Sequence, residues 1–157
     1  MIRTIKLAEY AYLADVNIAL FHTTTEKENS DIQAIVVKTM DVLKNRENDR
    51  DAAWVLEQNE EVVGSIAILE KNEKQAILHS FYIENAYRGK GFGESLMQTA
   101  ISFCQQRCYQ EIVLYVEPNA VPARNRYAHS GFTFQGTNTK TVGPLQIVEE
   151  EWLLALT

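Results

Sequence analysis

Three of the seven glycines in this chain fall within five residues, at positions 89, 91 and 93. The alternating apolar segment before them, at 76–84, predicts a strand, and residues 91–107 repeat apolar side chains at helical spacing. Because glycine has no Cβ to obstruct a turn, successive backbone N–H groups can face one point there. The pattern therefore predicts a strand that passes through a tight turn directly into a helix.

The rest of the chain predicts one mixed α/β domain over residues 1–157. In chain order, the expected elements are a short strand at 2–7, helices at 9–21 and 31–44, strands at 53–58, 62–70 and 76–84, a helix at 91–107, a strand at 112–116, a short helix at 121–130, and strands at 132–136 and 147–156. Ser30 or Asp31 is the expected N-cap of the second helix.

Length and composition exclude several classes of protein. A chain of 157 residues, 46% of them hydrophobic, can bury a core without cross-links. The two cysteines, Cys104 and Cys108, are one helical turn apart with no second pair, so we expect neither a disulfide framework nor a metal site. No apolar run approaches a membrane span, and the N-terminus lacks the apolar segment of a signal peptide, so we expect a cytoplasmic protein with no membrane partner.

Charge is unevenly distributed along the chain. The formal net charge of −6 argues against a nucleic-acid partner. Residues 1–74 carry nine basic and fourteen acidic side chains, whereas residues 75–140 carry six basic and four acidic ones. An anionic ligand is therefore tolerated best in the second segment, and the first favours a cationic acceptor, unless its charge serves only solubility.

The segment from Arg88 to Gly93 has the features of a phosphate-binding turn. Glycine backbone, two basic side chains and the start of a helix would together hold a phosphate or pyrophosphate. A Walker loop is excluded because Glu94 and Ser95 follow Gly93, and a dinucleotide fingerprint is excluded because Glu94 takes its sixth position. The glycines alone leave two interpretations open: a plain tight turn or a phosphate-binding loop.

A second motif decides between them by resemblance. The Arg-x-x-Gly-x-Gly pattern at 88–93 is similar to the acetyl-CoA loop of the GNAT superfamily of N-acetyltransferases. Asn119, followed by Ala123, Tyr127 and Gly131-Phe132, resembles the family's strand-end Asn and its Ala-x-x-x-Tyr-x-x-x-Gly-Phe helix. The likeness covers residues 62–137 well and extends to the closing strand at 152–156, whereas residues 1–50 match only in layout.

The resemblance implies a fold and an activity. The fold is α/β (α+β), with a single mixed, mostly antiparallel central sheet of about seven strands, splayed strands four and five, and about four flanking helices. The activity is transfer of an acetyl group from acetyl-CoA to a primary amine of a small molecule, by direct attack in a ternary complex. Alternatives are a protein lysine or N-terminus as acceptor, or a non-catalytic acyl-CoA-binding module. The oligomeric state stays open between a monomer and a homodimer.

The resemblance also assigns the cofactor site. The loop binds the pyrophosphate through its backbone, the strand before it pairs with the pantetheine arm, and a polar side chain beyond the next strand faces that arm. The implied cofactor-binding residues are Phe81, Tyr82, Ile83, Arg88, Gly89, Lys90, Gly91, Phe92, Gly93 and Asn119.

Two catalytic residues are expected. Tyr127 corresponds to the tyrosine that protonates or hydrogen-bonds the leaving thiolate, and a phenol with a pKa of about 10 suits that role. Ile77 occupies the neighbourhood of the family's usual glutamate base. His79 is the expected base instead, on the same strand face as Ile77, Phe81 and Ile83 by two-residue alternation. Rival bases are Glu84 and Glu117, and a mechanism without a dedicated base also stays open.

The resemblance further implies an acceptor pocket lined by the first two helices, the loop between them and the loop that joins the last two strands. The two loops correspond to residues 21–26 and 139–146. The two cysteines are expected on the helix after the glycine loop and not on a strand end that faces the thioester. We therefore expect no acetyl-cysteine intermediate.

Overall fold

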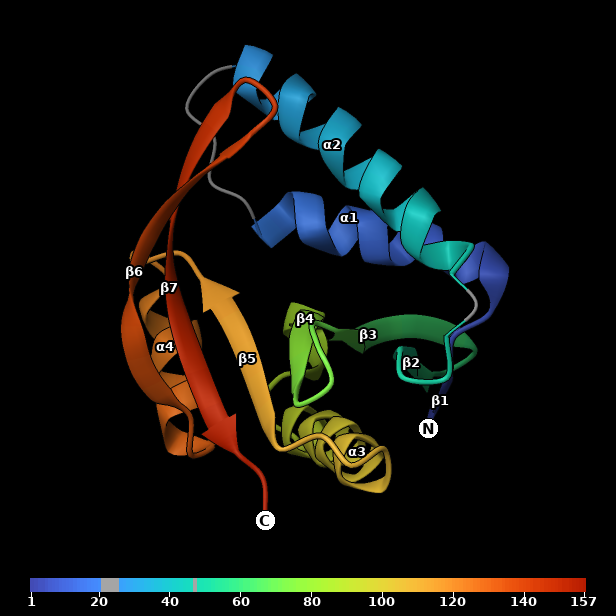
Figure 1. Ribbon diagram of the computed structural model, residues 1–157. Coiled ribbons are helices and arrows are strands. Elements are labelled where there is room, and N and C mark those ends of the chain that lie inside the picture. The colour runs from blue at the N-terminus through green and yellow to red at the C-terminus, as the bar shows by residue number, and fades with distance from the viewer. Residues whose placement is uncertain (21–25, 47) are drawn as a thin grey trace.

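The computed structural model describes residues 1–20, 26–46 and 48–157. One seven-stranded sheet, with the strand order β1-β2-β3-β4-β5-β7-β6, forms the centre of the molecule (Figure 1). Helices α1 and α2 cover one face of the sheet, whereas α3 and α4 pack on the other. The predicted fold class is confirmed.

The strands are β1 (Ile2–Thr4), β2 (Ala52–Gln58), β3 (Glu61–Glu70), β4 (Gln75–Ile83), β5 (Glu111–Val116), β6 (Thr133–Val142) and β7 (Leu145–Ala155). The helices are α1 (Tyr10–Leu20), α2 (Glu26–Lys44), α3 (Phe92–Gln106) and α4 (Val121–His129), with short 3₁₀ turns at Leu7–Glu9 and Asn85–Tyr87. None of the described helices is long and apolar enough to cross a bilayer.

Strands β4 and β5 form the only parallel pair among the described strands, and they separate after three residue pairs. Gln75, Ala76 and Ile77 pair with Glu111, Ile112 and Val113, and the pairing ends there. Both strands continue, β4 to Ile83 and β5 to Val116, so their facing edges carry unpaired backbone groups. This is the predicted splay of strands four and five.

A β-bulge at Ser80 changes which face of the sheet the end of β4 presents. Ser65 pairs with Tyr82 and Ala67 with His79, so two residues of β4 oppose one of β3, and Ser80 has a φ of +54°. Phe81 and Ile83 consequently join the core on the α3 side. His79 instead lines two hollows bordered by α1, so the expectation that it shares a face with Phe81 and Ile83 is wrong.

Three other predicted boundaries are wrong. The first strand ends at Thr4, and Leu7, expected within it, begins a 3₁₀ turn. Helix α2 begins at Glu26, so Ser30 and Asp31 lie inside it rather than at its cap. Residues 139–146 are not an open loop: Thr139 to Val142 pair with Val148 to Leu145, and a two-residue turn at Gly143 and Pro144 closes the hairpin. The β-branched residues 139, 141 and 142 suit an extended strand, and the hairpin reaches the helix layer, where a Cβ at Gly143 would lie 3.3 Å from Ile35 of α2.

Candidate active site

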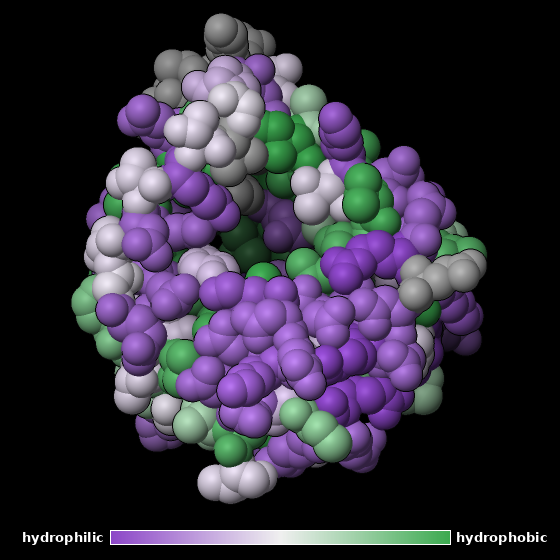
Figure 2. Space-filling model, viewed as in Figure 1, coloured by the Kyte–Doolittle hydropathy of each residue, from purple (hydrophilic) through white to green (hydrophobic). Residues whose placement is uncertain are grey.

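A cleft of about 280 Å³ opens where β4 and β5 separate. It appears as a hollow near the centre of the face seen in Figure 2, bordered by both polar and apolar residues. Its walls come from α1, β4, β5, α4 and the β6–β7 hairpin. The lining includes Asn17, His79, Ser80, Phe81, Tyr115, Glu117, Arg126, Tyr127, Lys140 and Glu149.

Tyr127 is buried at the wall formed by α4. Its ring centroid lies 6.3 Å from that of Phe81 and 5.8 Å from that of Phe132. Burial raises the pKa of the Tyr127 phenol, so the hydroxyl keeps its proton at neutral pH. A protonated phenol at this wall can donate a hydrogen bond to a sulfur or oxygen atom in the cleft.

The position of α4 is fixed one turn before Tyr127. Arg124 Nε donates to the buried Glu150 carboxylate at 2.7 Å, and Trp152 Nε1 donates to the same oxygen at 3.1 Å. Because Glu150 and Trp152 belong to β7, this network ties the tyrosine helix to the sheet.

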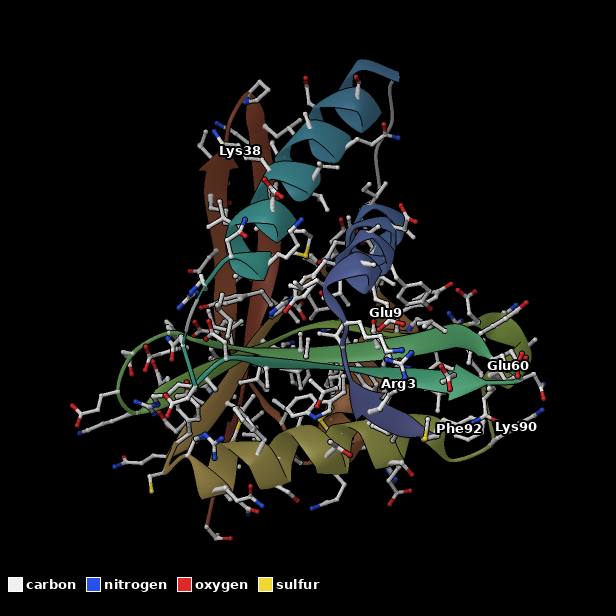
Figure 3. All side chains as sticks on the ribbon, turned by 90° about the vertical axis from the view of Figure 1, so that its right-hand side faces the viewer. Arg3, Glu9, Lys38, Glu60, Lys90 and Phe92 are labelled. Atoms are coloured by element: carbon white, nitrogen blue, oxygen red, sulfur yellow. The ribbon has the colours of Figure 1, made fainter. Side chains whose placement is uncertain are left out.

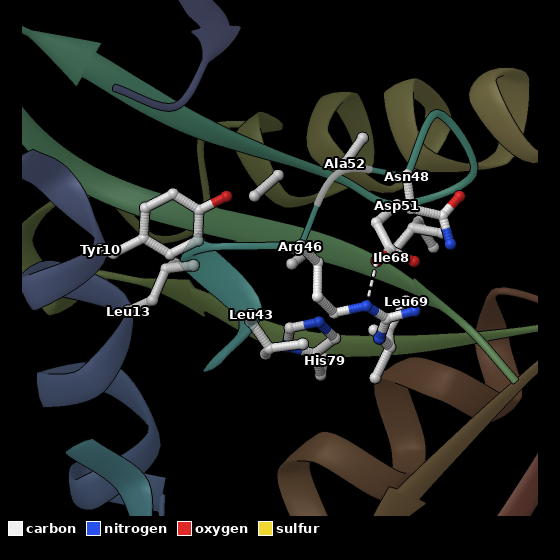
Figure 4. A pocket seen from close by; sticks show the side chains of 12 residues that line it. Tyr10, Leu13, Leu43, Arg46, Asn48, Asp51, Ala52, Ile68, Leu69 and His79 are labelled. Carbon is white, nitrogen blue, oxygen red and sulfur yellow. Dashed lines mark ion pairs between the residues drawn. The ribbon is translucent and has the colours of Figure 1, made fainter. Parts of the chain in front are cut away.

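His79 lies partly buried between the cleft and a smaller cavity on its other side. Its Nδ1 lies 2.9 Å from Ser80 Oγ, which also accepts a hydrogen bond from Asn17 Nδ2 at 2.7 Å. The smaller cavity, about 80 Å³, is bordered by the ion pair of Arg46 and Asp51, with an N–O distance of 3.1 Å (Figure 4). Burial lowers the pKa of His79 to about 4, so the imidazole is neutral at physiological pH.

The glycine loop has the conformation that its sequence predicts. Gly89 and Gly91 have φ values of +75° and +86°, and a Cβ at either would meet open space, so the backbone conformation itself selects glycine. Helix α3 begins at the next residue, Phe92, and the first N–H groups of a helix have no partner within it. Lys90 and Phe92 mark this end of α3 in Figure 3.

Arg88 and Lys90 contact their own segment of the chain. Arg88 Nε donates to the Ile83 carbonyl oxygen at 2.7 Å, and its guanidinium lies 5.3 Å from the Tyr82 ring centroid. Lys90 Nζ lies 5.7 Å from the ring centroid of Tyr87. Arg88 therefore holds the loop against the end of β4.

An outer groove of about 340 Å³ reaches Gly93 of this loop and shares two lining residues with the cleft. It runs between α3 and α4 and is lined by Phe81, Gly93, Glu94, Met97, Gln98, Ile101, Arg126, His129 and Ser130. Phe81 and Arg126 line both the groove and the cleft. Arg126 is not among the site residues that the sequence predicts, although it is a charged residue directly before Tyr127 in the second motif.

The other predicted residues are dispersed. Asn119 lies exposed in the turn after β5, where its carbonyl oxygen accepts a hydrogen bond from Val121 N at 2.9 Å. Of the rival bases, Glu117 lines the cleft, whereas Glu84 accepts a hydrogen bond from Tyr12 at 3.1 Å. Residues 21–25 of the expected acceptor pocket lie outside the described residues.

The cysteines lie away from the cleft. Cys104 is buried in the core contributed by α3, and burial raises the pKa of its thiol to about 12. Cys108 is exposed just beyond the end of α3. Neither position offers a thiolate to a ligand in the cleft.

Comparison with known proteins identifies one family. The model of the Acetyltransferase (GNAT) family matches residues 18–132. N-acetyltransferase 8B of Rattus norvegicus is 29% identical over 102 residues, which are 61% of this chain and 46% of that protein. The chain spans about half the length of the curated relatives that it matches.

Solved structures share the fold. An acetyltransferase from Streptococcus agalactiae superposes with a TM-score of 0.72 at 23% identity, covering 99% of this chain and 98% of that one. A GNAT family acetyltransferase from Elizabethkingia anophelis, solved with acetyl-CoA bound, has a TM-score of 0.58 at 11% identity, covering 68% of this chain and 77% of that one.

Proposed function

Because this chain belongs to the GNAT family of acetyltransferases, we propose that it moves an acetyl group from acetyl-CoA to a primary amine of a small molecule. The observation that carries this proposal is the separation of β4 from β5, which opens a cleft beside Tyr127. The outer groove, which shares Phe81 and Arg126 with this cleft, reaches the glycine loop at Gly93.

The glycine loop and the splayed strands suit the two parts of the cofactor. N–H groups of residues 89–93 and the positive end of α3 would bind the diphosphate. The edge of β4 beyond Ile77, unpaired toward β5, would bind the pantetheine arm as a further strand. Phe81 to Ile83 supply that edge, and these contacts would deliver the thioester to the cleft.

Chemistry in the cleft would follow direct attack. The amine nitrogen attacks the thioester carbonyl carbon, a C–N bond forms, and the C–S bond breaks to release the coenzyme A thiolate. Tyr127 would donate its proton to that thiolate, which suits a buried phenol that stays protonated at neutral pH.

His79 would accept the proton of the attacking amine, directly or through water. The tautomer that fits this role has its proton on Nδ1, donated to Ser80 Oγ, and leaves the Nε2 lone pair for the substrate. A pKa near 4 keeps the ring neutral and therefore able to accept a proton, although it also makes the ring a weak base.

The shape of the acceptor end favours a small molecule over a protein segment. The tip of the β6–β7 hairpin packs against α2, since a Cβ at Gly143 would lie 3.3 Å from Ile35. Leu145 packs beside the core between α1, α2 and the sheet. The tip of the hairpin is therefore held against the helix layer, and an extended peptide laid across this end would have to displace it.

Thiol release tests the proposal. The protein is incubated with acetyl-CoA and a panel of small primary amines, and free coenzyme A is measured against a no-enzyme background. We expect release above background with at least one amine, and N-acetylated product by mass spectrometry. Tight binding of coenzyme A without turnover on any amine or peptide would instead support a binding module.

A further inference from the structure

We infer that Arg126 is a second binding group for the cofactor, which pairs with its diphosphate from the α4 side, opposite the glycine loop. The inference rests on the proposed function and adds a specific electrostatic contact to it. It begins from the position of Arg126, which with Phe81 lines both the outer groove and the cleft.

Two aromatic rings lie beside Arg126, where the linings of the groove and the cleft meet. Arg126 Cζ lies 5.0 Å from the Phe81 ring centroid and 5.9 Å from that of Tyr127. A Cβ at Gly93 would lie 3.6 Å from Cζ of the same Phe81 ring. The guanidinium and the first turn of α3 therefore both lie close to this ring. A ligand with its diphosphate at the loop and its thioester beside Tyr127 must pass Arg126.

A diphosphate in the groove needs a cation on the α4 side, because the charged side chains near the start of α3 do not balance its charge. Glu94, in the first turn of α3, lines the groove and would repel a diphosphate. Arg88 is directed to the Ile83 carbonyl and the Tyr82 ring. Arg126 and His129 line the opposite wall, and the planar guanidinium of an arginine matches phosphate oxygens in a bidentate manner.

The contacts that Arg126 makes in this structure are weak enough to be replaced by a contact with a phosphate. Arg124, two residues earlier, is committed to the buried Glu150 carboxylate at 2.7 Å. Arg126 is exposed and rests on aromatic rings, an interaction weaker than a charge-assisted hydrogen bond. It can therefore leave the rings for a phosphate oxygen at little cost.

The test compares Arg126→Gln with Lys38→Gln. Lys38 is an exposed residue of α2, far from the loop marked by Lys90 and Phe92 (Figure 3), so its substitution controls for the net charge. The dissociation constant of coenzyme A is measured by calorimetry at low and at near-physiological ionic strength, with thermal melting as a check of folding. Arg126→Gln should weaken binding by between about 10-fold and 100-fold at low ionic strength, with a smaller loss when salt screens the charges.

Two further results complete the test. Arg126→Lys should recover part of the affinity because it restores the charge without the planar fork, and Lys38→Gln should bind like the wild type. Unchanged affinity in Arg126→Gln, or an equal loss at both ionic strengths, would overturn the inference and leave the proposed function intact. A folded wild-type protein that bound no coenzyme A would refute the proposed function, and this inference with it.

Discussion

The hydroxyl of Ser65 donates a hydrogen bond to the carbonyl oxygen of Ser80, with 2.6 Å between the two oxygens. Both serines are buried, and Ser80 is the bulge residue of β4, with a positive φ. The bulge directs Phe81 toward α3 and leaves His79 on the α1 side. This hydrogen bond between neighbouring strands therefore stabilises the bulge that places Phe81 and His79 on opposite faces of the sheet.

Ser65→Ala should destabilise the protein by about 1–3 kcal/mol, because it leaves the buried Ser80 carbonyl oxygen without this donor. Urea unfolding measures the change in the free energy of unfolding. Ser30→Ala, at an exposed position of α2, is the matched control and should change stability by less than about 0.5 kcal/mol. Equal stabilities of Ser65→Ala and the wild type would mean that the bulge does not depend on this bond.

Gly91→Val should abolish measurable binding of acetyl-CoA while the fold is retained. A β-branched residue is strongly disfavoured at a φ of +86°, so the loop must rearrange and its N–H groups no longer converge. Calorimetry measures the affinity and circular dichroism the fold. Gln105→Val, exposed near the other end of α3, introduces the same side chain and should bind normally. Normal binding by Gly91→Val would remove the loop from the cofactor site.

Tyr127→Phe should lower turnover by roughly 100-fold, within the range of lost general acid catalysis, with little change in acetyl-CoA affinity. The phenyl ring keeps its packing on Phe81 and Phe132, so stability should change little. The control is Tyr109→Phe, which loses a hydrogen bond to the Arg50 carbonyl at 2.9 Å and should lower stability rather than turnover. Full activity of Tyr127→Phe would remove its hydroxyl from the mechanism.

The lowered pKa of His79 should make the free energy of unfolding decrease in mild acid. Its pKa is about 4 in the folded protein and about 6.5 when unfolded, so between these values the unfolded chain binds more protons. The His79 contribution is complete above pH 6.5 and is lost as the pH falls toward 4, at up to about 1.4 kcal/mol per pH unit.

Urea unfolding across this pH window measures the effect. His79→Gln should flatten the slope, whereas His129→Gln, at an exposed position, should preserve it. Glu9, whose pKa Arg3 lowers to about 2 through a salt bridge of 2.7 Å (Figure 3), loses its stabilising effect at lower pH, below about 4.5. An unchanged slope in His79→Gln would contradict the lowered pKa of the His79 ring.

Local patterns in the sequence were enough for the parts of the site that depend on local backbone. The turn at 88–93 was predictable because glycine tolerates positive φ at 89 and 91, and the strand and helix around it follow from apolar periodicity. The face of His79 was not predictable, because two-residue alternation holds only while the strand is regular. The bulge that breaks it depends on contacts with Ser65 on β3 and Asn17 on α1.

Residue type, periodicity and two spaced motifs determined the order of the elements, the glycine loop and the membership of Tyr127 in a helix. Tertiary structure alone decided that Arg126 reaches over Phe81, that the β6–β7 hairpin extends to α2, and that His79 lies between two hollows. The physical reason is the range of the interactions. Backbone conformation and helix periodicity are set by neighbours within a few residues, whereas these three features depend on contacts between segments far apart in the chain.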